Sequence, residues 1–266
     1  DDVHLLAHAC VVQPVKQPIS RAMQRTAPHR TTPHRTAPHR ISPVVDRAAR
    51  ACALPCLLLV GLFAAVAETE KSAPKKVGWV ETVKLDLQGW TVLADARLVN
   101  GEYKALGTRS LSMLANHLER LTILMPEKQL AALRKMEIFI EHSHPELKNM
   151  QYHPDADWLV ERGYDPRLAK KVHITHAAEL LSRPQMLKHP AVILHELAHA
   201  YHNQVLGFDD PAIVKVYEDA MKKGIYEKSL LYTGETVKHY ATTNHKEYFA
   251  EATEAYLYHN DFYPFV

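Results

Sequence analysis

The sequence His-Glu-Leu-Ala-His at residues 195–199 constrains the fold of this chain more than any other feature. Residues four apart lie on one face of an α-helix, about one turn from each other, so the two histidines are neighbours only if this stretch is helical. The stretch Ala191–Val205 contains no proline and no glycine, Pro190 suits a first helical turn, and Gly207 is a plausible helix stop. The sequence therefore predicts a helix with both histidines on one face.

Apolar side chains recur at helical spacing in this stretch and predict that the helix is buried; they are Ile193, Leu194, Leu197, Ala198 and Tyr201. A buried imidazole needs a partner for its ring nitrogens, and two imidazoles one turn apart can share a metal ion. The spacing is that of a zinc site in which Glu196 takes a proton from metal-activated water. The alternative is an ordinary core helix with hydrogen-bonded histidines, since a chain with 18 histidines matches a short pattern more easily.

A catalytic zinc ion usually has three protein ligands, so a third must come from elsewhere. The extended motif with a third histidine would need it at position 205, where the chain has Val205. The segment Asn244–Tyr256 instead places Glu247 and Glu251 four apart on one predicted helical face. These carboxylates repel each other unless a cation lies nearby. One would bind metal and the other would accept a hydrogen bond from a ligating histidine; the spacing leaves open which does which, and a solvated acidic face is the alternative.

Together these residues resemble the catalytic domain of the anthrax lethal factor-like metallopeptidases, which are gluzincins. The resemblance covers roughly residues 150–260 and rests on the histidine motif, Tyr240 and the sequence Glu-Tyr-Phe-Ala-Glu at 247–251. It implies an α+β, zincin-like domain in which a small sheet packs on an active-site helix and a glutamate-bearing helix. It also implies Zn²⁺ as the cofactor, with His195, His199 and Glu247 as its ligands.

The same resemblance implies a role for three further side chains. Glu196 would be the general base, the hydroxyl of Tyr240 would stabilise the oxyanion, and Glu251 would accept a hydrogen bond from a ligating histidine. The alternative for Tyr240 is a packed aromatic residue. The closing residues 260–265 are similar to secreted bacterial metallopeptidases that run on beyond this point, so we expect the chain to be a fragment lacking a helix or two.

The first 67 residues read differently from the rest. A five-residue repeat over 26–40, Thr-Ala-Pro-His-Arg with one Thr-Thr variant, has no apolar side chain larger than alanine, so we expect residues 1–46 to be a disordered low-complexity leader. Residues 47–67 have the pattern of a secretory signal peptide: a basic start, an uncharged run and a closing Ala-Val-Ala. The run is short for a membrane span, which needs about 20 residues, and an uncleaved anchor is the alternative.

The charge and cysteine content also divide at this point. Residues 1–67 hold 8 Lys and Arg against 3 Asp and Glu, a net charge of +5, and residues 68–266 hold 24 against 27, a net charge of −3. The basic balance therefore belongs to residues 1–67 and indicates no nucleic-acid partner. Cys10, Cys52 and Cys56 lie in the same range, so residues 68–266 can form no disulfide and no thiolate zinc site.

Periodicity and turn residues predict one α+β domain over residues 68–266. Strands are expected within 77–98, 136–141 and 171–175, a loop-rich stretch at 142–166, a hairpin at 229–239, and helices at 110–124, 126–134, 211–223 and 244–256. The strand at 171–175 could receive a peptide backbone if it lies at the sheet edge, and a fully paired internal strand is the alternative.

We therefore predict a secreted zinc metallopeptidase that hydrolyses peptide bonds in peptides or proteins, with no stable membrane insertion after signal cleavage. A second hypothesis is an exported binding module with a non-catalytic zinc site, against which the intact Glu196 and Tyr240 argue. A third is zinc-dependent hydrolysis of an amide other than a peptide.

Overall fold

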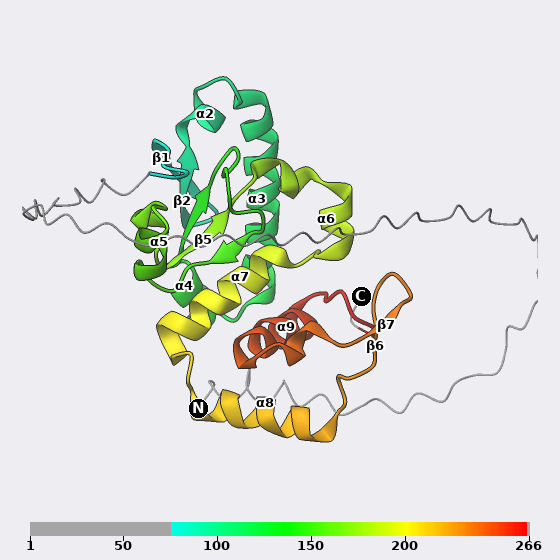
Figure 1. Ribbon diagram of the computed structural model, residues 1–266. Coiled ribbons are helices and arrows are strands. Elements are labelled where there is room, and N and C mark those ends of the chain that lie inside the picture. Colours follow the sequence, from blue (N-terminus) through cyan, green and yellow to red (C-terminus); the bar gives the residue numbers. More distant parts are fainter. Residues whose placement is uncertain (1–75, 265–266) are drawn as a thin grey trace, which may run out of the picture. The chain divides into compact units, whose positions relative to one another are not determined.

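The computed structural model describes residues 76–264, and the predicted leader and signal peptide lie outside this range. The described residues form a five-stranded sheet of order β1-β2-β3-β5-β4 with helices on it, which confirms the mixed α+β class (Figure 1). β1 and β2 form an antiparallel hairpin, β2, β3 and β5 run parallel, and β4 is antiparallel to β5. The strands are β1 (Thr82–Leu87), β2 (Trp90–Asp95), β3 (Glu137–Ile140), β4 (Gln151–Tyr152) and β5 (Lys171–Ile174).

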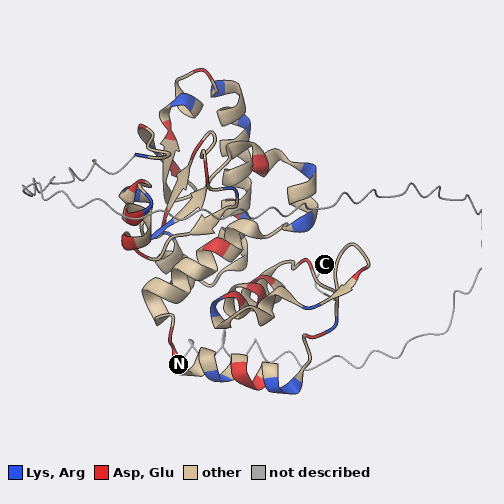
Figure 2. Cartoon of the chain, in the orientation of Figure 1, with Lys and Arg blue, Asp and Glu red and all other residues tan. Residues whose placement is uncertain are grey.

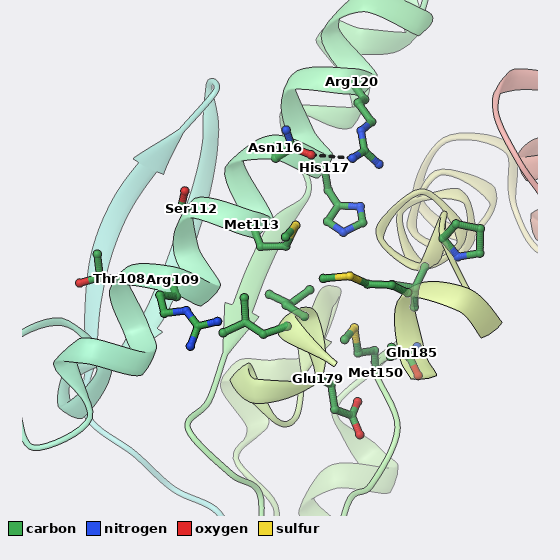
Figure 3. A pocket seen from close by; sticks show the side chains of 15 residues that line it. Thr108, Arg109, Ser112, Met113, Asn116, His117, Arg120, Met150, Glu179 and Gln185 are labelled. Atoms are coloured by element: carbon green, nitrogen blue, oxygen red, sulfur yellow. Dashed lines mark hydrogen bonds between the residues drawn. The ribbon is translucent and has the colours of Figure 1, made fainter. Parts of the chain in front are cut away.

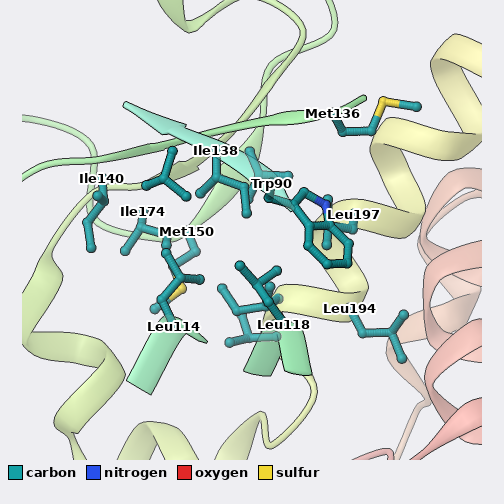
Figure 4. Packing of buried hydrophobic residues seen from close by; sticks show 14 of the residues in the cluster. Trp90, Leu114, Leu118, Met136, Ile138, Ile140, Met150, Ile174, Leu194 and Leu197 are labelled. Atoms are coloured by element: carbon teal, nitrogen blue, oxygen red, sulfur yellow. The ribbon is translucent and has the colours of Figure 1, made fainter. Parts of the chain in front are cut away.

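One face of the sheet packs on α3 (Lys104–Leu124) and on α7 (Val192–Tyr201), the helix that carries the histidine motif. Successive residues of a strand point to opposite faces, so Ile138 and Ile140 of β3 face these helices. Figure 4 shows the resulting cluster, in which side chains of the sheet meet those of both helices; it includes Trp90, Ile138, Ile140, Ile174, Leu114, Leu118, Leu194 and Leu197. The apolar face of α7 is therefore fixed against the sheet, as its periodicity predicts.

The opposite face of the sheet is covered by the segment between β4 and β5. Phe139, which alternates with its two isoleucine neighbours, packs there with Leu159 and Leu168. These come from α5 (Asp157–Glu161) and the 3-10 turn η1 (Pro166–Leu168). The sequence predicts this stretch as loop, because its elements are too short for a periodic pattern to show.

β4 belongs to the same stretch and changes the predicted role of its neighbour. The strand predicted at 171–175 is confirmed as β5, but it lies inside the sheet, bonded to β3 on one side and to β4 on the other. Of the two alternatives that the sequence leaves open, the internal strand is therefore confirmed and the edge strand is excluded. The outermost strand next to α7 is β4. It has only two residues, so it shows no alternating pattern by which the sequence could predict it.

The second half of the chain follows the predicted order. The helix predicted at 211–223 is α8 (Pro211–Lys223), the hairpin is β6 (Ser229–Leu230) with β7 (Thr236–Val237), and the glutamate helix is α9 (His245–Leu257). Asn244 caps α9, because its side-chain oxygen accepts from the backbone N–H groups of Lys246 and Glu247. α9 packs against α7 through Ala198, Phe249 and Ala250.

Some boundaries differ from the prediction. α3 begins at Lys104, six residues before the predicted start, and α7 begins at Val192, so Pro190 precedes it. A π-helical turn, η3 (His202–Leu206), continues α7 and ends at Gly207, whose φ of 89° suits glycine. The remaining helical segments are α2 (Ala96–Val99), α4 (Glu127–Leu133), η2 (Ala177–Leu181), α6 (Arg183–Lys188) and η4 (Tyr240–Thr242). Within residues 76–264, no helix combines the length and the apolarity that a membrane crossing requires.

Gly107 gives a test of how α2 and α3 pack. A Cβ atom at this position would lie 1.9 Å from the backbone oxygen of Leu98 in α2. We predict that Gly107→Ala lowers the free energy of unfolding by about 1–3 kcal/mol, because α2 must move, although helix propensity alone favours alanine by about 1 kcal/mol. Urea unfolding followed by circular dichroism measures the change. Ser112→Ala, at an exposed position of α3, is the control, and unchanged or higher stability of Gly107→Ala would contradict the packing.

Candidate metal centre

Five of the six predicted site residues line one cleft of about 930 Å³ between α7 and α9, and Glu251 lies behind it. α7 contributes His195, Glu196 and His199, and α9 faces it with Glu247. Residues around β4 and of the β6–β7 hairpin also line the cleft. The two helices differ in charge, as Figure 2 shows. α7 carries one acidic residue, Glu196, whereas α9 carries three: Glu247, Glu251 and Glu254.

The predicted ligand atoms of His195, His199 and Glu247 meet at one point. Nε2 of His195 lies 3.1 Å from Nε2 of His199 and 3.2 Å from Oε2 of Glu247. Nε2 of His199 lies 3.3 Å from the same carboxylate oxygen. Ligand atoms of a tetrahedral zinc ion with bonds of about 2.0–2.1 Å are separated by about 3.3 Å, so this triangle has the dimensions of three zinc ligands.

The hydrogen-bonding chemistry of the trio also fits a cation. Nδ1 of His195 donates to a carboxylate at its back, so in the neutral imidazole Nε2 carries a lone pair and faces the oxygen of Glu247. Burial would lower the pKa of His195, but the charge of Glu254 and the hydrogen bonds to Glu247 and Glu254 raise it well above its ordinary value. The site therefore favours positive charge, which a metal ion or a proton supplies.

Glu247 is held as a carboxylate. Burial alone would raise its pKa, but the contacts with His195 and His199, which are hydrogen bonds when these imidazoles are protonated, hold the pKa well below the usual range of a glutamate. It enters the cleft from the first turn of α9, where the Asn244 cap fixes the start of the helix. Glu247 is thus ionised and aimed at both imidazoles, as a metal ligand must be.

Glu196 projects from α7 between the two histidines and is buried. Burial and, to a smaller extent, the charge of Glu247 raise its pKa, while the nearby histidines and a hydrogen bond from the backbone of Tyr152 act in the opposite direction. A buried carboxylate beside a cation site, with a raised pKa, is suited to accept and return a proton.

Tyr240 begins η4, directly after the β6–β7 hairpin predicted to deliver it. It is 49% exposed and lines the cleft together with Glu247. Burial of part of the side chain, followed by the charge of Glu247, raises the pKa of Tyr240, so its hydroxyl stays protonated and can donate a hydrogen bond.

The structure places two glutamates behind His195. Oε1 of Glu254 lies 2.8 Å from Nδ1 of His195, whereas Oε1 of Glu251, the predicted acceptor, lies 3.7 Å away. Burial, and then the charge of Glu254, raise the pKa of Glu251 to about 8. The sequence analysis assigns no role to Glu254, although its position seven residues after Glu247 puts it on the same helical face.

A second group of potential ligands shares His195. One ligand atom each of His189, His195 and Glu251 lies within 4.8 Å of the others. The rings of His189 and His195 are 5.4 Å apart. An ion in this group would compete with the 2.8 Å hydrogen bond from His195 to Glu254, which leaves the trio with Glu247 as the better formed site.

His202 does not join the ion site, although it lies one turn beyond His199. It is fully buried, and its ring packs 4.7 Å from the ring of Phe249 and 5.3 Å from that of Phe208. Neither ring nitrogen has a hydrogen-bond partner among the described residues. Its ring therefore packs between aromatic side chains of neighbouring segments.

Comparison with protein-family models, with curated proteins and with solved structures finds no match to this chain. The assignment of the site therefore depends on its own geometry.

His202 gives a pH-dependent prediction. Burial lowers its pKa to about 4, against about 6.5 in an unfolded chain. Between these values the unfolded chain binds the additional proton, so His202 costs stability as the pH falls from about 7 towards 4. Leucine at this position binds no proton. We therefore predict that lowering the pH from 7.5 to 5 raises the free energy of unfolding of His202→Leu, relative to that of the natural protein, by about 2 kcal/mol.

Denaturant unfolding of the metal-free protein at both pH values measures this difference. His259→Leu, at an exposed position, is the control for the loss of a histidine. A stability difference between His202→Leu and the natural protein that is the same at pH 7.5 and pH 5 would contradict the lowered pKa.

Proposed function

We propose that the chain is a zinc-dependent metallopeptidase with a zincin-like, gluzincin-type catalytic domain, and that it is exported. The single observation that carries the proposal is the triangle of ligand atoms from His195, His199 and Glu247, with sides of 3.1, 3.2 and 3.3 Å. Imidazole nitrogen and carboxylate oxygen are ligands that zinc accepts, and three of them leave a fourth position open. Placement of Glu196 and Tyr240 in the same cleft supports hydrolysis over mere metal binding.

The residues of the cleft would divide the chemistry between them. When bound, Zn²⁺ lowers the pKa of a water to about 7 and polarises the carbonyl of the substrate. Glu196 takes a proton from the attacking water and later delivers it to the leaving nitrogen. Tyr240 donates its hydroxyl hydrogen to the oxyanion of the tetrahedral intermediate, and loss of one such donor typically costs about 10²–10³ in rate.

The substrate path that we propose starts at β4. β4 is the outermost strand beside α7, and Met150, Gln151 and Tyr152 line the cleft. An outer strand can pair with an extended peptide, which would bring a peptide bond past the zinc ligands. This takes the role that sequence analysis gave to the strand at 171–175.

A second hollow of about 750 Å³ continues this path. It lies between α3 and the α6 region and shares four lining residues with the cleft: Met150, Glu179, Gln185 and Val192. Figure 3 shows Met113 of α3 and Met150 on its wall, and Arg109 beside them. Methionine side chains adapt to apolar groups of varied shape. We propose that a large apolar side chain of the substrate occupies this hollow.

Two other functions stay open to test. An exported binding module would use the zinc site for structure alone, and a third class of enzyme would cleave an amide outside a peptide. The position of the buried Glu196 in the cleft, between the two histidines, favours catalysis over the binding module. Assay of a broad peptide library against simple amides separates the two enzymatic functions.

We predict that Glu196→Gln keeps zinc but loses activity. The substitution preserves size and removes the group that accepts the proton, so peptide hydrolysis should fall by about 10²–10⁴. Metal analysis of the purified protein should give about one zinc per chain for both forms, and hydrolysis of an unfolded protein is followed by mass spectrometry.

Glu146→Gln is the matched control, because Glu146 lines the same cleft but hydrogen-bonds Tyr164. It should retain most of the activity. Full activity of Glu196→Gln would remove the general-base assignment, and zinc-loaded natural protein that cleaves nothing in a broad peptide library would favour the binding module.

The second hollow gives a separate prediction. Met113→Trp narrows it, so kcat/KM should fall about tenfold or more for peptides that place a leucine there, which corresponds to the burial of one large apolar side chain. Peptides shortened to end before this residue should be cleaved equally by both forms. Ser112→Ala, which also touches the hollow, is the control. Equal losses on long and short peptides would contradict the proposed path.

A further inference from the structure

His195 is held from behind by a residue that the family resemblance does not assign. Its Nδ1 donates to Oε1 of Glu254 over 2.8 Å, and Glu254 is fully buried. Glu251, which the resemblance implies for this contact, approaches Nδ1 only to 3.7 Å. A distance of 3.7 Å is beyond the range of a hydrogen bond, so the contact belongs to Glu254.

Asn260 contacts both glutamates. Its side-chain amide donates to Oε2 of Glu251 over 2.8 Å and to Oε2 of Glu254 over 3.3 Å. Oε1 of Glu251 then has no hydrogen-bond partner within residues 76–264, whereas Glu254 holds Asn260 with one oxygen and His195 with the other. Asn260 is itself buried and fixed, since its side-chain oxygen accepts from the backbone N–H of Phe262.

The chain segment that contains Asn260 also reaches the tyrosine side of the cleft. The backbone oxygen of Asp261 accepts from Tyr232 over 2.8 Å, and Phe262 stacks on the ring of His239 at 3.8 Å. His239 immediately precedes Tyr240. One short segment therefore braces both the imidazole of His195 and the approach to Tyr240.

The chemical effect of this contact is specific. A carboxylate that accepts from Nδ1–H fixes the imidazole tautomer, so the lone pair lies on Nε2 and points into the triangle of ligand atoms. It also fixes the ring plane, and its charge makes Nε2 a stronger ligand. Both residues are buried, and such a hydrogen bond is stronger in the interior than at the surface.

We propose that Glu254, braced by Asn260, is the positioning residue that orients His195 for metal binding, and that Glu251 does not serve this purpose. This rests on the proposed function, because it assigns a role toward the zinc ion. The alternative use of Glu251 is as a ligand in the group with His189, which would require His195 to release Glu254.

The test compares Glu254→Gln with the matched variant Glu251→Gln in the full chain. In ¹⁵N-labelled metal-free protein, the Nδ1–H proton of His195 should lie far downfield, and it should move in Glu254→Gln but hardly at all in Glu251→Gln. Zinc affinity, measured by competition with a chromophoric chelator, should fall about 10–100-fold in Glu254→Gln and change less than about threefold in Glu251→Gln. Urea unfolding identifies any variant that fails to fold.

Each outcome decides a separate point. A His195 resonance that depends on Glu251, or a larger loss of zinc affinity in Glu251→Gln, would overturn the proposal. An unchanged zinc affinity in a folded Glu254→Gln protein would overturn it as well. The His195 resonance could shift in Glu254→Gln while the natural protein binds no zinc. This result would overturn the proposed function, but the contact between His195 and Glu254 would stand. Asn260→Ala should weaken zinc binding in the same direction as Glu254→Gln, and an unaltered affinity would remove Asn260 from the proposal.

Discussion

The hydrogen bond and charge interactions of one buried imidazole, His195, organise the rest of this structure. Its two nitrogens face carboxylates of one helix, Glu247 in front and Glu254 behind. Removing charged groups from water is costly, so such an arrangement is stable only when each charge has a partner. The contact therefore requires α7 and α9 to pack closely and in one register, which the small residues Ala198 and Ala250 permit.

The five-stranded sheet holds α7 in place. α7 lies on the sheet through Leu194 and Leu197, which join the main apolar core. Its other face presents His195, Glu196 and His199 to the cleft. A helix with one face locked in a core holds its polar side chains in place, as a metal site needs. α9 is held by apolar packing of Phe249 and Ala250 and by the hydrogen bonds that the buried Asn260 donates to Glu251 and Glu254.

The candidate site was largely accessible from the sequence because its residues form two local patterns. Two histidines four apart and two glutamates four apart each define a helical face. The short elements were not accessible. β4 has two residues and α5 has five, so neither shows a periodic pattern, yet β4 displaces β5 from the sheet edge. The choice between Glu251 and Glu254 was also out of reach, since both lie on the same helical face.

By itself, the sequence determined the α+β class, the main helices and the sets of side chains on each helical face, because these depend on local periodicity. Only the tertiary structure decided which sets meet. It brought Glu247 to the two histidines across 52 residues of chain from His195, placed Glu254 rather than Glu251 on Nδ1, and turned His202 into an apolar environment. These outcomes depend on the angle and register at which α7 and α9 pack, which arise from contacts between distant segments and leave no periodic pattern in either segment alone.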